Sequence, residues 1–238
     1  MPLRTMFVTL LLAAAFPAQA QELDARYDLS LRGITGGQIA LAGRQEGAGY
    51  SVGAEAKATG LVGTLLKYGY EGRARGQYVA GRPVSQSYSE IENDDGERTE
   101  ADVAFRGTRP AAVTFTPPRE PRDHDIDPTA QRGVIDPLSA LYDVMRPTTP
   151  SRACNRRYDL FDGRHVSRLT LGQPAAGADG TIRCAGEYRR IAGYAPERLA
   201  ERPVVRLDIL YAPAGPGAVA VSEVRSPTRF GDAVLRRR

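Results

Sequence analysis

The stretch DPLSALYDVMRP at residues 136–147 places one helix in a chain that otherwise alternates polar and apolar residues. Asp136 is a good N-cap, and Pro137 suits the first helical position, where its missing N–H costs nothing. Four apolar residues then recur at i, i+3, i+4 and i+7: Leu138, Leu141, Tyr142 and Met145. The stretch predicts an amphipathic helix over residues 136–146, which Pro147 ends. A helix this short is marginal alone, so its apolar stripe must pack against a sheet.

Period-two alternation on both sides of that helix predicts the sheet. Tyr27–Leu31 alternates polar and apolar residues, and Gln38–Leu41 follows Gly36-Gly37 as its hairpin partner. Asp95-Gly96 and Asp162-Gly163 are strong signals for further tight turns. We therefore predict a mainly β fold, an antiparallel curved sheet or incomplete barrel wrapped around one amphipathic helix. Residues 21–238 are expected to form a single β-rich domain.

Residues 1–20 have the pattern of a cleavable secretory signal. Arg4 precedes an apolar run from Phe7 to Phe16, and Ala18-Gln19-Ala20 matches the small-x-small cleavage pattern. The run is too short for a transmembrane anchor, and no later segment is apolar enough to span a bilayer as a helix. An outer-membrane barrel is the alternative, which the arginine ending 236–238 disfavours. We expect an exported, periplasmic protein without a transmembrane span in its mature chain.

The charge of the chain argues against nucleic-acid binding. The net charge is +4, of which Arg4 and the three terminal arginines account for all. Basic and acidic residues elsewhere are interspersed, so no basic stripe for phosphate backbones is expected. Only Lys57 and Lys67 are lysines, which suggests a compositional bias of the source genome; a functional arginine surface is the alternative and requires clustering.

The two cysteines, Cys154 and Cys184, are expected to pair, because an exported chain folds in an oxidising compartment. The bond would close a loop of about thirty residues and contribute about 3 kcal/mol. A catalytic thiol is the alternative and would need His124 or His165 as its base.

The proline-rich, charged segment 116–133 is predicted to be a surface loop. It contains Asp123, His124, Asp125 and Asp127, which are legitimate metal ligands. Neighbouring ligands on a flexible loop rarely converge on one ion, so we expect neither a metal nor a cofactor.

Asp162, His165 and Ser167 are the residue types of a catalytic triad. They lie within one hairpin, where alternation separates Asp162 from the other two. No nucleophile elbow, zinc-protease motif, phosphate loop or dinucleotide fingerprint occurs, so no catalytic residue is predicted. A pair of catalytic carboxylates, as in a glycoside hydrolase, comes together only in the fold, so this alternative stays open.

Several motifs together resemble a family of exported proteobacterial proteins classed as a domain of unknown function. They are Tyr27-Asp28-Leu29, Gly33, Gly37, Asp136–Tyr142, Cys154, Phe161-Asp162-Gly163-Arg164, Cys184 and Tyr188–Tyr194. The resemblance implies an envelope location and a paired Cys154–Cys184, and no activity. The predicted architecture also looks like periplasmic lipoprotein-carrier half-barrels and β-spiral envelope proteins.

Three functions are consistent with these observations. The first is a non-catalytic periplasmic protein that binds a lipid, an acyl chain or a protein segment in envelope maintenance. The second is a hydrolase of an envelope polymer, and the third is a structural partner in an envelope complex. The ligand-binding residues and the oligomeric state are not predicted.

Overall fold

The computed structural model describes residues 21–65 and 67–238, and the expected signal segment lies outside these residues. Fourteen strands form one sheet in the order β7-β6-β5-β4-β3-β2-β1-β14-β13-β12-β11-β10-β9-β8. The strands of the first half are β1 (Gln21–Leu31), β2 (Ile34–Glu46), β3 (Gly49–Ala58), β4 (Tyr68–Val79), β5 (Arg82–Asp94), β6 (Glu97–Arg106) and β7 (Arg109–Thr116). Those of the second half are β8 (Val134–Ile135), β9 (Arg156–Phe161), β10 (Val166–Ala176), β11 (Ile182–Ala192), β12 (Val204–Pro213), β13 (Val219–Thr228) and β14 (Gly231–Arg237).

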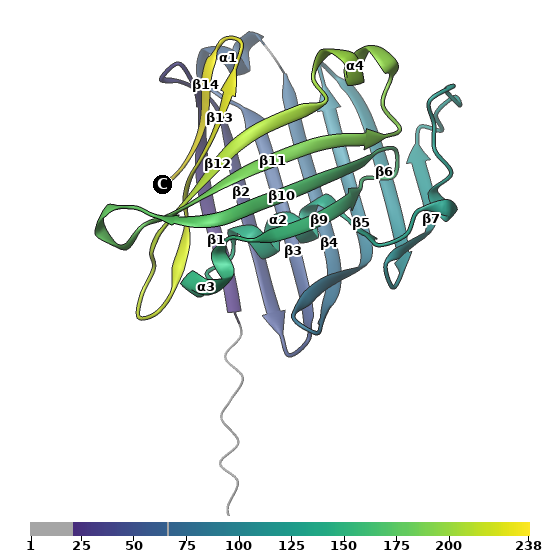
Figure 1. Cartoon of the computed structure of the whole chain (residues 1–238). Coiled ribbons are helices and arrows are strands. Elements are labelled where there is room, and N and C mark those ends of the chain that lie inside the picture. Colours follow the sequence, from purple (N-terminus) through teal and green to yellow (C-terminus); the bar gives the residue numbers. More distant parts are fainter. Residues whose placement is uncertain (1–20, 66) are drawn as a thin grey trace, which may run out of the picture.

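The two halves are antiparallel meanders joined where β1 pairs with β14. The mainly β, antiparallel prediction is therefore confirmed, although β8 pairs with β9 in parallel. The sheet curls into a nearly closed barrel in which β10–β12 cross over β2–β5 (Figure 1). Its edges β7 and β8 approach each other, and the backbone N–H of Val134 donates to the carbonyl of Thr108 at 3.2 Å.

Helix α2 (Pro137–Met145) lies between the two halves (Figure 1), with contacts to β3, β4, β5, β9 and β13. Asp136 caps it, and the backbone conformation of Arg146 ends it. Three further short helices occur in the described chain: α1 (Gly60–Leu65), α3 (Pro150–Ala153) and α4 (Pro196–Glu201). The predicted helix is present as α2, but a single helix is not confirmed, because helices of four to six residues are too short to show a periodic apolar stripe. Single 3-10 turns form at Pro128–Ala130 and Ala178–Gly180.

One of the four residues predicted for the apolar stripe was wrong. Leu138, Tyr142 and Met145 are buried, but Leu141 is 37% exposed. The polar residues Ser139 and Asp143 are buried instead. The helix thus has core contacts nearly all round, because strands from both halves supply partners for its polar side chains.

One hairpin differs from its predicted position. The chain turns between β1 and β2 at Arg32-Gly33, which both have positive φ, and not at Gly36-Gly37. Gly36 lies within β2, where an added Cβ would stand 2.7 Å from a methyl of Val62 in α1. Gly36 therefore serves close packing. Asp95-Gly96 does form its predicted turn, and both residues have positive φ.

Candidate functional site

The N-terminus of α2 is held by a buried hydrogen-bond cluster. The Asp136 carboxylate accepts bonds from the backbone N–H of Ser139 at 2.7 Å and from the hydroxyls of Ser139 and Ser85. Tyr50 of β3 donates to the Ser139 hydroxyl at 2.7 Å. Burial raises the pKa of Asp136 above its usual value, although these hydrogen bonds oppose the increase. The cluster joins the cap of the helix to β3 and β5.

A second buried carboxylate holds the other end of α2. Asp143 accepts bonds from the hydroxyls of Tyr78 at 2.9 Å and Tyr158 at 2.6 Å. It also forms ion pairs with Arg146 at 3.1 Å and Arg156 at 3.2 Å. Every oxygen of this carboxylate therefore has partners, and the cluster joins α2 to β4 and β9. Its role is to fix the helix in the barrel.

The triad-like residues are close together but are not arranged as a triad. Asp162 accepts from the backbone N–H groups of Arg164 and His165 and lies 2.9 Å from Nδ1 of His165. Burial raises the pKa of Asp162, but its hydrogen bonds and the His165 charge outweigh burial and hold that pKa below its usual value. The Ser167 hydroxyl instead accepts from Tyr188 at 2.7 Å and lies 2.5 Å from the hydroxyl of Tyr194. No hydrogen bond joins Ser167 to His165 in the described chain.

The residues around Asp162 and His165 also bring two of the sequence motifs together. The His165 ring stacks on Tyr194 with centroids 4.2 Å apart, and the Arg190 guanidinium lies 5.4 Å from the Tyr194 centroid. Arg164 reaches across to Glu90 of β5 at 3.3 Å. These contacts join the end of β11 to the β9–β10 turn, and that turn to the opposite half of the sheet. The motifs therefore occupy structural positions at one end of the barrel.

The charged loop residues 117–133 do not gather ligands. Asp125 is paired with Arg119 at 2.6 Å, and Asp127 caps the turn at Pro128–Ala130 through the N–H of Thr129. Within the described residues no group of three or more His, Cys, Asp or Glu side chains is placed to hold a metal ion.

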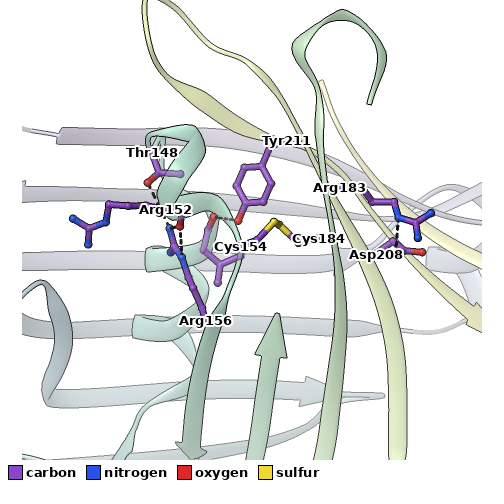
Figure 2. The surroundings of a disulfide bond; sticks show 9 residues. Thr148, Arg152, Cys154, Arg156, Arg183, Cys184, Asp208 and Tyr211 are labelled. Atoms are coloured by element: carbon purple, nitrogen blue, oxygen red, sulfur yellow. Dashed lines mark hydrogen bonds and ion pairs between the residues drawn. A yellow bond between two sulfur atoms is a disulfide. The ribbon is translucent and has the colours of Figure 1, made fainter. Parts of the chain in front are cut away.

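Cys154 and Cys184 form the predicted disulfide (Figure 2). Cys154 follows α3 and Cys184 lies in β11, so the bond joins the segment after α2 to the sheet. Both residues are buried. Nearby, the hydroxyl of Tyr211 donates to the carbonyl of Val144 in α2 at 3.0 Å.

An apolar end of the barrel was missed by the sequence analysis. Inward-facing side chains are buried around α2, but their exposure rises along the strands towards α1. Along β1, Leu23 and Tyr27 are buried, while Leu29 and Leu31 are exposed. We call the exposed apolar side chains there the apolar end: Leu29, Leu31, Ile34, Leu65, Tyr68 and Phe230.

The apolar end is formed by neighbouring turns. The β1–β2 and β13–β14 turns touch, since the N–H of Arg32 donates to the carbonyl of Asp232 at 3.4 Å. Helix α1 packs on β2 at the same end (Figure 1). Ile34, Leu65 and Phe230 at the tips are 65%, 81% and 55% exposed. Leu29 and Leu31 belong to the alternation at residues 27–31, but their convergence with Ile34, Leu65 and Phe230 depends on segments that are neighbours only in the fold.

A polar furrow runs over strands β1–β6. A hollow of about 580 Å³ is bounded there by Arg26, Lys57, Glu55, Glu71 and Arg98, above the small side chains of β2 and β3. With Arg238, its lining has four basic and two acidic residues, so its charge is mixed. No helix of the described chain is long and apolar enough to cross a bilayer.

Comparisons with known proteins add a family and no activity. A crystal structure of a β-barrel-like protein of domain of unknown function DUF1849 from Brucella abortus has a TM-score of 0.47 and 11% identity, over 91% of this chain and 95% of that chain. A search of curated proteins finds no match. The model of the family described as protein of unknown function (DUF3108) matches residues 26–189, well over half of the chain. The chain therefore belongs to the DUF3108 family of proteins of unknown function.

Proposed function

We propose that this is a non-catalytic, exported envelope protein that binds lipid through its apolar end. The observation that carries the proposal is the set of three apolar tips, Ile34 at the start of β2, Leu65 at the end of α1 and Phe230 between β13 and β14, each more than half exposed. Exposed large apolar side chains that gather on neighbouring elements mark interaction surfaces. Isolated apolar side chains scattered over a surface would need no such explanation.

Lipid is the occupant that the surroundings of the tips favour. Each tip has a basic residue within two positions along the chain, namely Arg32, Lys67 or Arg229. Apolar tips flanked by cations are typical of segments that rest in the interface of an anionic membrane. Acidic residues of the β5–β6 turn lie next to Lys67, since the N–H of Asp95 donates to its carbonyl at 3.1 Å. Insertion of the apolar side chains is therefore expected to contribute more to membrane binding than attraction between charges.

The interior continues the apolar surface inwards. Behind the tips, half-buried apolar side chains from both halves of the sheet pack on the core; Ile39, Tyr70, Leu207, Val224 and Leu235 are among them. An acyl chain that entered at the apolar end would meet these side chains before it reached α2. The proposal thus includes a lipid chain as well as a membrane surface.

The compartment and the lack of catalysis belong to the same proposal. The Cys154–Cys184 disulfide supports folding in an oxidising compartment, as export through a signal at residues 1–20 would require. The bonding of Ser167 to Tyr188 and Tyr194, and not to His165, supports a non-catalytic role. A protein partner in the envelope is the second candidate, because exposed apolar tips also suit a protein interface.

Vesicle co-sedimentation of the mature protein tests the proposal. We expect binding to vesicles of phosphatidylglycerol and phosphatidylethanolamine, and a loss of at least fivefold in the triple variant Ile34→Ser, Leu65→Ser and Phe230→Ser. Val79→Ser is the matched control, since Val79 is 51% exposed at the opposite end of β4. Absence of vesicle binding, or equal loss in the control, would refute lipid binding at this end and leave the protein partner.

A further inference from the structure

A cavity of about 450 Å³ opens at the end of the barrel opposite α1, beside the disulfide. It lies between the β4–β5 turn and the segment that leads from α3 into β9. Its charged lining consists of four arginines and one aspartate: Arg82, Arg152, Arg156, Arg157 and Asp143. Three of the arginines lie within residues 152–157, and the fold brings Arg82 next to that segment.

Two of these charged residues are already engaged. Asp143 is neutralised by Arg146 and Arg156 and is bonded to two tyrosine hydroxyls. Arg156 also donates from Nε to the carbonyl of Arg152 at 2.6 Å (Figure 2). Neither residue therefore needs a ligand, and together they form a fixed wall of the cavity.

The other three arginines have no acidic partner. Arg152 donates to the carbonyl of Gly81 at 3.1 Å, which joins α3 to the β4–β5 turn. Among the described residues no carboxylate forms an ion pair with Arg82, Arg152 or Arg157. Several other arginines do have such partners, as Arg236 has Glu223. Three arginines without a carboxylate partner thus line one hollow, and a bound anion would compensate their charge.

We propose that this cavity binds a phosphate-bearing ligand. The planar guanidinium donates two parallel hydrogen bonds to a phosphate, which makes arginine clusters suitable phosphate sites. The volume lies within the range of small-molecule sites and exceeds that of a single phosphate ion, so the remainder of the ligand would also fit. Ser151 and Asn155 in the lining add neutral polar groups for that remainder.

The disulfide positions this site. Cys154 is part of the lining and directly precedes the segment that carries Arg156 and Arg157. Its bond to Cys184 fixes that segment to β11, so the arginines are held without the ligand. The phosphate could belong to a lipid headgroup or to a soluble compound, and the two sources can be separated experimentally.

Calorimetric titration of the full mature protein with inorganic phosphate and with pyrophosphate tests the soluble source, and vesicles of phosphatidylglycerol against phosphatidylcholine test the headgroup. We expect saturable binding, weakened at least tenfold in the double variant Arg82→Gln and Arg157→Gln. Arg206→Gln is the control, because Arg206 is exposed on β12 outside the cavity. Both arginines in the variant are exposed, so thermal unfolding should stay near the wild-type value.

The outcomes separate this site from the apolar end. Pyrophosphate binding that is lost in the double variant supports the site whatever the vesicle result for the apolar end. Vesicle binding that depends on Arg82 and Arg157 but not on the apolar tips assigns the site to a headgroup. Absence of saturable binding to every probe, or equal weakening in Arg206→Gln, overturns the proposal.

Discussion

Gly193 lies against the carbonyl of Arg164 so closely that a Cβ on Gly193 would stand 2.2 Å from that oxygen. The contact joins the Tyr188–Tyr194 motif to the Phe161–Arg164 motif. The sequence shows both motifs but not that they touch. This close approach explains why residue 193 is a glycine.

Gly193→Ala should destabilise the protein by about 2–5 kcal/mol, because positive φ costs a non-glycine residue about 1–2 kcal/mol and the clash adds to it. Urea unfolding followed by circular dichroism measures the change. Gly217→Ala is the control, since Gly217 also has positive φ but no atom near its Cβ position. Equal losses in the two variants would show that the contact with Arg164 is unimportant.

Removal of the disulfide should lower the free energy of unfolding by about 3 kcal/mol, since the bond closes a loop between residues 30 apart. The double variant Cys154→Ser and Cys184→Ser tests this in chemical denaturation, compared with wild type with and without reductant. Reductant should lower the stability of the wild type and leave the variant unchanged. A wild type insensitive to reductant under unfolding conditions would contradict the expectation.

Asp143→Ala should be strongly destabilising, by about 3–5 kcal/mol, because it leaves Arg146 and Arg156 without their buried carboxylate. Asp159→Ala provides the comparison: its pair with Arg168 is partly exposed and should contribute less than about 1 kcal/mol. Differential scanning calorimetry of both variants gives the ranking. The opposite ranking would contradict a structural role for the Asp143 cluster.

The lowered pKa of Asp162 predicts a pH-dependent contribution to stability. Its folded pKa lies below the unfolded value of about 3.9, so the contribution is present above that pH and is lost as the pH falls through the folded pKa. The stability advantage of wild type over Asp162→Asn should therefore be constant near neutral pH and shrink below about pH 4. Urea titrations from pH 7 to pH 2.5 measure it. An advantage that grows with acidity would show that the sign is wrong.

Local chemistry could be predicted from the sequence, and long-range partners could not. Asp136 and Pro137 predicted the start of α2 because capping depends on neighbours in the chain. Burial of Ser139 and Asp143 was missed, since their partners Tyr50, Tyr78 and Tyr158 come from distant strands. Strand β8 was missed because two residues show no alternation.

The candidate sites illustrate the same limit. The disulfide was predictable because two cysteines allow one intramolecular pair. The arginine-lined cavity was not, because Arg82 and Arg157 lie on strands from different halves of the sheet. The apolar end likewise depends on turns that are neighbours only in the fold.

Insertion of the apolar end into lipid can be measured directly, because the chain contains no tryptophan. Phe230→Trp places the only tryptophan of that variant at an exposed tip, and Val79→Trp places one at the opposite end of the barrel, so excitation of tryptophan reports each position separately. With vesicles that contain brominated lipid, the account predicts a blue shift and quenching for Phe230→Trp and neither for Val79→Trp. Unchanged emission of Phe230→Trp, or equal quenching of both, would contradict it.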